Sequence, residues 1–146
     1  MISVNILAAI DFSDATNRLV PAITQFSKAH DAKVWLIHVA EEEPPGGFEV
    51  HSTTLRDAVA ETYRDEHKRL QELAKELRDQ KIDATALLIR GPAAETILQE
   101  AERLDTGAII IGSHGHGALH DVLMGSTGSS VLRQSHCPVV VVPIRG

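Results

Sequence analysis

A glycine-rich segment, residues 112–128, holds the residue types best suited to binding chemistry. It reads GSHGHGALHDVLMGSTG and directly follows a short apolar run. Glycine at positions 112, 115 and 125 lets the backbone take positive φ and approach a ligand closely. This pattern is typical of a loop that holds a phosphate chain. On composition alone, a glycine-rich connector that turns the chain and binds nothing is the alternative.

A helix N-terminus is expected at the end of this segment, because Ser126 or Thr127 can cap a helix there. The amides of residues 125–128 would then point out of the helix start, where anions bind favourably, and the two hydroxyls add donors. Two other phosphate motifs are excluded by spacing. A Walker A loop requires a lysine, but none follows Lys81, and the dinucleotide fingerprint requires glycine where the chain has His120.

Three histidines, His114, His116 and His120, lie in the same segment, which contains no Lys or Arg. Unperturbed imidazole titrates near pH ~6.5, so we hypothesise that these side chains supply a pH-dependent positive charge. The alternative is three solvated loop histidines. A metal site is not predicted, because His114 and His116 form a short pair without a clear carboxylate or third ligand.

No catalytic residue is predicted. Ser113 and His114 are neighbours in sequence, which does not establish the geometry of a nucleophile and its base. Cys137, the only cysteine, stands beside a proline at the start of an apolar run and is expected to be a packed thiol. A single cysteine also excludes an internal disulfide framework and a multi-cysteine zinc site.

The whole chain has 146 residues, of which 43% are hydrophobic, 23% charged and 3% aromatic, with a formal net charge of −6 at pH 7. This length suits one domain, and we expect residues 1–146 to form it. The acidic charge and the scarcity of aromatic residues argue against a nucleic-acid-binding protein. The sequence shows neither a signal-peptide pattern nor the ~20 apolar residues of a membrane span, so we expect no membrane partner and a cytoplasmic location.

Five short apolar runs are typical of strands buried on both faces of a parallel sheet, because most of them are apolar at nearly every position. They span residues 2–10, 34–39, 84–89, 108–111 and 139–142. Helical patterns fill the intervals. The resulting order, β-α-β-α-β-α-β-α-β, predicts a three-layer α/β sandwich.

The helix signals are of three kinds. Ser13 or Asp14 can cap the first helix, and apolar residues at helical spacing mark a longer one over residues 55–81. Pro92 is expected at the first position of a third helix, where its missing N–H does no harm. Residues 41–54 form the longest loop-like stretch, which we interpret as a solvated connector; a lid over a ligand is the alternative.

Taken together, these motifs resemble those of the universal stress protein family. Its nucleotide signature, G-x2-G-x9-G-[ST], is matched by Gly112, Gly115, Gly125 and Ser126. The first apolar run ends in Ala-Ile-Asp at residues 9–11, and the last segment reads HCPVVVVP. The resemblance covers essentially the whole chain as one unit.

The resemblance implies a Rossmann-like fold, similar to the adenine nucleotide alpha hydrolases, with a five-stranded parallel sheet of order 3-2-1-4-5 flanked by helices. Asp11 and Gly112 would then face each other across the crevice where open α/β sheets bind ligands. The implied ligand is ATP, or ADP or AMP, with or without Mg²⁺. The residues that the resemblance assigns to the nucleotide site are Ala9, Ile10, Asp11, Val39, Ile111, Gly112, Ser113, Gly115, Gly125, Ser126 and Thr127.

Within that set, the Asp11 carboxylate would accept a hydrogen bond from the nucleoside, and the Val39 backbone would recognise the adenine edge. Ser113, Ser126 and Thr127, with nearby amides, would hold the ribose and phosphates. An acid stabilised by a helix start is the alternative for Asp11, and core packing is the alternative for Val39. Many nucleotide-binding members carry Lys or Arg in the glycine loop. Here amides and Mg²⁺ must neutralise a triphosphate, or a less charged nucleotide is preferred.

The resemblance also implies a stress-response regulator rather than a metabolic enzyme. Residues 139–142 would form an edge strand of four valines, which would pair with a second copy across a two-fold axis and give a homodimer. A shielded edge is the alternative. Two other functions stay open: a stress-induced interaction protein that binds no nucleotide, and a slow ATPase. The sequence does not indicate a downstream protein partner.

Overall fold

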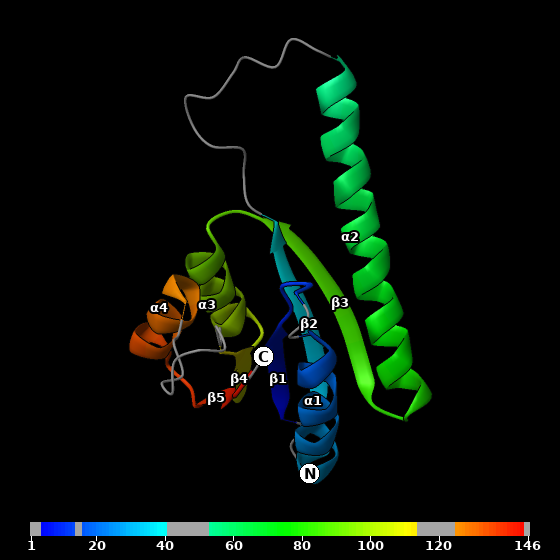
Figure 1. The fold of residues 1–146 in the computed structure, drawn as a ribbon. Helices are drawn as coiled ribbons and strands as arrows, with labels where there is room; N and C mark the ends of the chain where they lie inside the picture. Colours follow the sequence, from blue (N-terminus) through cyan, green and yellow to red (C-terminus); the bar gives the residue numbers. More distant parts are fainter. Residues whose placement is uncertain (1–3, 14–15, 41–52, 114–124, 145–146) are drawn as a thin grey trace.

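The computed structural model describes residues 4–13, 16–40, 53–113 and 125–144, drawn as the coloured ribbon of Figure 1. Strands and helices alternate along the chain, as the hydrophobic pattern predicts. The elements are β1 (Asn5–Ala9), α1 (Thr16–His30), β2 (Lys33–Ala40), α2 (Thr53–Asp79), β3 (Asp83–Arg90), α3 (Ala93–Arg103), β4 (Ala108–Gly112), α4 (Ser126–Gln134) and β5 (Val139–Val142).

The five strands form one parallel sheet in the order β3-β2-β1-β4-β5, which confirms the expected strand order. Helices α1 and α2 pack on one face, and α3 and α4 pack on the other, so the protein has three layers (Figure 1). Strand β1 pairs with both β2 and β4. The direction in which strands are added therefore reverses between β1 and β4, and open α/β sheets bind ligands at such a switch point.

Alternate residues of the inner strands supply the two faces of the core. On β1, Ile6 and Ala8 pack with α1 and α2, whereas Leu7 packs with α3 and α4, and all three are fully buried. On β4, Ile110 and Ile109 divide between the faces in the same way. Burial on both faces explains why the inner strands are apolar at nearly every position.

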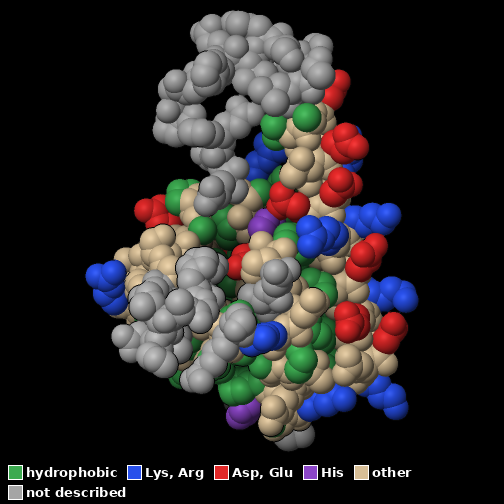
Figure 2. Space-filling model, viewed as in Figure 1, with side chains coloured by type: hydrophobic (Ala, Val, Ile, Leu, Met, Phe, Trp, Pro, Cys, Tyr) green, Lys and Arg blue, Asp and Glu red, His purple; other side chains and the backbone are tan. Residues whose placement is uncertain are grey.

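Helix α2 is the longest element, with 27 residues, and its N-terminal part extends beyond the carboxyl ends of the strands (Figure 1). Its C-terminal part is anchored by Leu70, Ala74 and Leu77, which are buried. Side chains of both charges cover its outer surface (Figure 2). None of the helices in the described residues has the length and apolar character of a membrane span. Residues 41–52 of the expected connector lie outside the described residues, and Thr53 already belongs to α2.

The start of α3 differs from the prediction by one residue. The helix begins at Ala93, and Pro92 is its N-cap, with an extended ψ of 129°. The Pro92 carbonyl accepts a hydrogen bond from the Thr96 N–H (3.0 Å). Proline is tolerated here for the predicted reason, because the first helical positions have no intrahelical acceptor for their N–H groups.

The start of α4 also differs. Ser126 is the first helical residue, and the N-cap is Gly125, so the prediction that Ser126 or Thr127 caps this helix was wrong. The first turn closes through the backbone, with the Ser129 N–H donating to the Gly125 carbonyl (2.9 Å). Glycine is an acceptable N-cap residue, and it leaves no side chain over the amides of the first turn.

The predicted positive φ at Gly112 and Gly125 is not found. Gly125 has a φ of −65°, and among the described glycines only Gly91 has a left-handed φ, of 149°. Gly112 continues β4 and is closely packed, because an added Cβ would lie 3.3 Å from Cγ1 of Ile144 and that side chain would have to shift by a few tenths of an ångström. The glycine pattern therefore reports close packing at this position rather than an unusual turn.

Candidate functional site

A cavity of about 1020 Å³ opens at the carboxyl ends of β1, β2 and β4, and it is large enough for a small-molecule ligand. Helix α2 forms one wall, and the first turns of α3 and α4 contribute to the other. The lining residues are Ala9, Ile10, Asp11, Leu19, Ile37, His38, Val39, Ala40, Ala58, Val59, Thr62, Tyr63, Glu66, Arg90, Ala93, Ile97, Ile111, Gly112, Ser113, Thr127 and Gly128. The cavity thus lies at the switch point of the sheet.

The predicted nucleotide-binding residues fall into three groups. Those that line the cavity are Ala9, Ile10, Asp11, Val39, Ile111, Gly112, Ser113 and Thr127. Gly125 and Ser126 lie at the N-terminus of α4 and are not among the lining residues. Gly115 lies outside the described residues, as do the three loop histidines His114, His116 and His120. Residues far apart in the sequence thus meet at one cavity.

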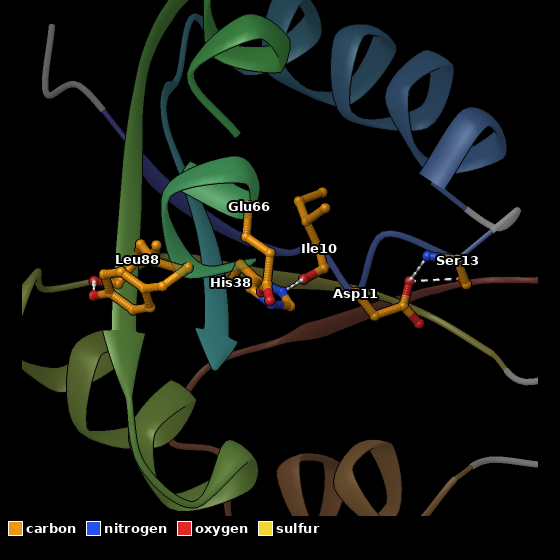
Figure 3. A network of polar contacts seen from close by, with 7 residues as sticks. Ile10, Asp11, Ser13, His38, Glu66 and Leu88 are labelled. Carbon is orange, nitrogen blue, oxygen red and sulfur yellow. Dashed lines mark hydrogen bonds and ion pairs between the residues drawn. The ribbon is translucent and has the colours of Figure 1, made fainter. Parts of the chain in front are cut away.

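Asp11 follows β1 and is exposed at the cavity. Its Oδ1 accepts hydrogen bonds from the Ser13 N–H (3.0 Å) and from the Ser13 hydroxyl (2.7 Å) (Figure 3). Between these residues, Phe12 has a φ of 57°, a left-handed conformation that few residues with a side chain adopt. The Asp11–Ser13 hydrogen bonds support this turn, which takes the chain out of the sheet at the edge of the cavity.

The backbone of Val39 faces the crevice beyond the end of β1. The β1–β2 register ends at the pair Ala9 and Ile37. There the Ile37 carbonyl accepts a hydrogen bond from the Ile10 N–H (2.8 Å), whereas the pairing of β2 with β3 continues to Ala40. In a parallel sheet, alternate residues direct both backbone groups toward the same neighbouring strand. The N–H and C=O of Val39 therefore point to the β1 side, past the last pair of the register.

Gly112 and Ser113 join the cavity to the C-terminal segment. Ser113 is only 2% exposed, and its Oγ accepts a hydrogen bond from the Ile144 N–H (2.9 Å). Its own N–H donates to the Val142 carbonyl (3.0 Å). The hydroxyl hydrogen of Ser113 can still donate. The side chain predicted to contact a ligand therefore also fixes the residues after β5.

Sequence reasoning missed five polar side chains that line the cavity: His38 from β2, Thr62, Tyr63 and Glu66 from α2, and Arg90 from β3. Arg90 is the one Lys or Arg among the described lining residues, and its guanidinium carbon lies 4.5 Å from the centroid of the Tyr63 ring. A histidine inside an otherwise apolar strand was a signal for His38. Glu66 had none, because it is one of many acids on a helix of mixed charge.

His38 is held at both ring nitrogens. Nδ1 lies 2.6 Å from the Ile10 carbonyl oxygen, and Nε2 contacts Oε2 of Glu66 (Figure 3). The Phe12 ring is tilted against the imidazole, with the centroids 4.6 Å apart. The Arg69 guanidinium carbon lies 4.5 Å from the centroid of that Phe12 ring. This network ties the end of β1 to α2 across β2.

Within the described parts of the chain, no three His, Cys, Asp or Glu side chains gather closely enough to hold a metal ion. Cys137 is half-buried and packs against the core between the sheet, α3 and α4, in agreement with the expected packed thiol. The described lining of the cavity offers hydrogen-bonding groups, the carboxylates of Asp11 and Glu66, and the guanidinium of Arg90. These groups suit binding of a polar ligand.

Comparison with known proteins identifies relatives of this chain and solved structures with the same fold. The model of the universal stress protein family matches residues 4–143. Universal stress protein A homolog 2 of Coxiella burnetii is 31% identical over 143 residues, which cover 97% of this chain and 95% of that protein. The solved structure of MJ0577, a universal stress protein of Methanocaldococcus jannaschii, has a TM-score of 0.79 at 27% identity and covers 100% of this chain and 99% of its own.

A further solved structure, the universal stress protein of Archaeoglobus fulgidus in complex with dAMP, has the same fold. Its TM-score is 0.65 at 20% identity, with 97% of this chain and 98% of that chain covered. These matches span nearly the whole length of each chain, and the two solved structures share the fold of this one. The chain therefore belongs to the universal stress protein family.

Proposed function

We propose that this universal stress protein binds one adenine nucleotide in the cavity at the switch point and acts as a nucleotide-responsive regulator rather than as a metabolic enzyme. The observation that carries the proposal is the orientation of the Val39 N–H and C=O, which point into the crevice beyond the end of β1. Asp11 and Thr127 line the same cavity. The dAMP complex of a family member with this fold supports the choice of an adenine nucleotide.

Each part of the nucleotide has a matching group in this proposal. The adenine edge both donates and accepts, and so do the N–H and C=O of Val39. The Asp11 carboxylate accepts a hydrogen bond from a ribose hydroxyl. The phosphates are held by main-chain amides of the loop that contains Gly115 and by the start of α4, at Gly125, Ser126 and Thr127, because a helix N-terminus favours anions.

Charge sets the expected preference among nucleotides. The chain has a net charge of −6, and residues 112–128 contain no Lys or Arg. Arg90 brings a positive charge to the cavity from β3, but a triphosphate carries more negative charge than this residue offsets. Without Mg²⁺, we expect AMP to bind at least as tightly as ATP. With Mg²⁺, the affinity for ATP should rise more than the affinity for AMP.

Calorimetric titration with ATP, ADP and AMP, each with and without Mg²⁺, tests the function. We expect saturable binding of one nucleotide per chain, and mass spectrometry of ligand released from freshly purified, denatured protein should show an adenine nucleotide. If none of the three nucleotides binds at millimolar concentration, the proposal is wrong. An interaction protein that binds no nucleotide then becomes the better explanation of the function.

We also propose that the protein is a homodimer paired through β5. This strand lies at the edge of the sheet. The Ile109 N–H donates to the Pro138 carbonyl (3.0 Å) and the Ser113 N–H donates to the Val142 carbonyl (3.0 Å). The backbone groups of Val140 and Val142 in β5 therefore face β4. Those of Val139 and Val141 point away from β4. Those outward groups are available to a second copy.

Val141→Pro tests the dimer, because it removes an outward N–H while the bonds to β4 are kept. We expect wild type to sediment as a dimer at micromolar concentration and the V141P variant to sediment as a folded monomer. The matched control, Val140→Pro, removes an N–H that faces β4 and should instead lower the free energy of unfolding. A monomeric wild type, or a V141P protein that stays dimeric, would contradict pairing through β5.

A further inference from the structure

The Ile10 carbonyl has two possible donors at the end of β1. In a parallel ladder, the rung that follows the bond from the Ile10 N–H to the Ile37 carbonyl would join the Val39 N–H to the Ile10 carbonyl. That carbonyl instead lies 2.6 Å from Nδ1 of His38. The imidazole thus occupies the acceptor with which the Val39 N–H would otherwise extend the β1–β2 ladder.

We propose that His38 is a positioning residue for nucleotide binding, which holds the Ile10 carbonyl and so leaves the Val39 N–H to the adenine base. The inference rests on the proposed function, in which the Val39 backbone recognises that base. The left-handed Phe12 contributes to the same opening, because it takes the chain out of the sheet directly after this point. His38 therefore acts through Ile10 and Val39.

Glu66 fixes the second ring nitrogen from α2. The side chains of His38 and Glu66 are only 14% and 23% exposed, so solvent screens their interaction weakly. Both partners of the ring, the Ile10 carbonyl and the Glu66 carboxylate, are acceptors. A neutral imidazole donates through only one nitrogen. When Nδ1 donates to the Ile10 carbonyl, the contact of Nε2 with Glu66 is a hydrogen bond only if the pair carries an additional proton.

Aromatic and charged side chains surround the His38–Glu66 pair. Phe12 lies against the imidazole, and Arg69 of α2 lies over Phe12. The other charged or titratable side chains on the described lining of the cavity are Asp11 after β1, Tyr63 of α2 and Arg90 of β3.

Three substitutions separate the contacts. His38→Leu removes both of them. His38→Asn keeps a side-chain amide near the position of Nδ1 for the Ile10 carbonyl and loses the contact with Glu66. Glu66→Gln keeps both contacts without the additional proton, because the glutamine amide can donate to Nε2 of a neutral imidazole.

The rate of amide hydrogen exchange at Val39 reports whether its N–H is hydrogen-bonded within the protein, and it can be measured without any ligand. We expect this exchange to be slower in H38L than in wild type, because the N–H can then bond to the released Ile10 carbonyl, and to be unchanged in H38N. A folded H38L protein whose Val39 amide exchanges as in wild type would overturn the proposal. This measurement is independent of whether the protein binds a nucleotide.

Nitrogen NMR of the His38 ring in wild type provides a second measurement, which decides the matter if H38L does not fold. We expect Nδ1 to carry a proton both in wild type and in E66Q, because it donates to the Ile10 carbonyl in the proposed arrangement. A wild-type Nδ1 without a proton cannot donate to a carbonyl, and that result would overturn the proposal.

Titration with AMP measures the consequence for binding. We expect H38L to bind AMP about tenfold more weakly, as for one lost neutral hydrogen bond, and H38N and E66Q to stay within about threefold of wild type.

The two proposals fail in different ways. If wild type binds AMP and H38L binds it equally well, His38 is not a positioning residue and the proposed function stands. If wild type does not bind AMP, the proposed function fails. The Val39 exchange and the ring-nitrogen measurement then still show whether His38 prevents the Val39 N–H from bonding to the Ile10 carbonyl.

Discussion

Asp11→Ala is expected to weaken the binding of AMP about 10- to 100-fold, as for the loss of one hydrogen bond to a charged group. The carboxylate is exposed in the cavity at the switch point. In the proposed complex it accepts a hydrogen bond from a ribose hydroxyl. Calorimetric titration of both proteins under the same buffer and salt measures the ratio of the dissociation constants.

The Asp11 carboxylate also supports the turn to Ser13, so a control must separate the two roles. Asp11→Asn keeps an oxygen that can accept from the Ser13 N–H and hydroxyl, but it removes the negative charge. We expect D11N to bind AMP more tightly than D11A and less tightly than wild type. If D11A binds AMP as wild type does, Asp11 is only part of the turn, and its assignment to the ribose is wrong.

Ile110→Ala is expected to lower the free energy of unfolding by about 2–5 kcal/mol, the usual range for truncating a buried aliphatic side chain. Ile110 is fully buried on β4, between β1 and β5, and it packs in the core beneath α1 and α2. Urea unfolding measures this change in the free energy of unfolding. Both proteins are compared at the same concentration, because association between chains adds to the apparent stability.

Leu132→Ala is the matched control for the core substitution. Leu132 is 43% exposed on α4, so its truncation should change the free energy of unfolding by no more than about 0.5 kcal/mol. A midpoint for I110A that falls no further than that of L132A would mean that β4 is not a central element of the core. Such a result would contradict the strand order on which the position of the cavity depends.

The family resemblance implied the site residues, and several of those that line the cavity stand at the ends of recognisable strands. Asp11, Val39 and Gly112 each end or follow a buried apolar run, and parallel strands bring their carboxyl ends to one edge of a sheet. Periodicity alone established these runs. The strand order that makes β1 and β4 neighbours came from the family resemblance, since local pattern does not say which strands pair.

The helix starts show where local rules are insufficient. Serine and threonine are favoured N-cap residues, yet Gly125 caps α4 and both hydroxyl residues lie within its first turn. Which residue becomes the cap depends on where the chain leaves β4 and where α4 packs on the sheet. Gly112 is similar, because the close contact that a side chain would make there comes from Ile144, which is distant in the sequence.

The sequence by itself determined the number, type and order of the elements, because burial on one or both faces imposes a period on apolar residues that is visible along the chain. Only the tertiary structure decided that Glu66 meets His38 and that Arg90 and Tyr63 line the same cavity. Those side chains come from elements whose relative position depends on the length of α2 and the register of β2 with β3. A contact between elements is set by how they pack together, and the local pattern of either element does not encode it.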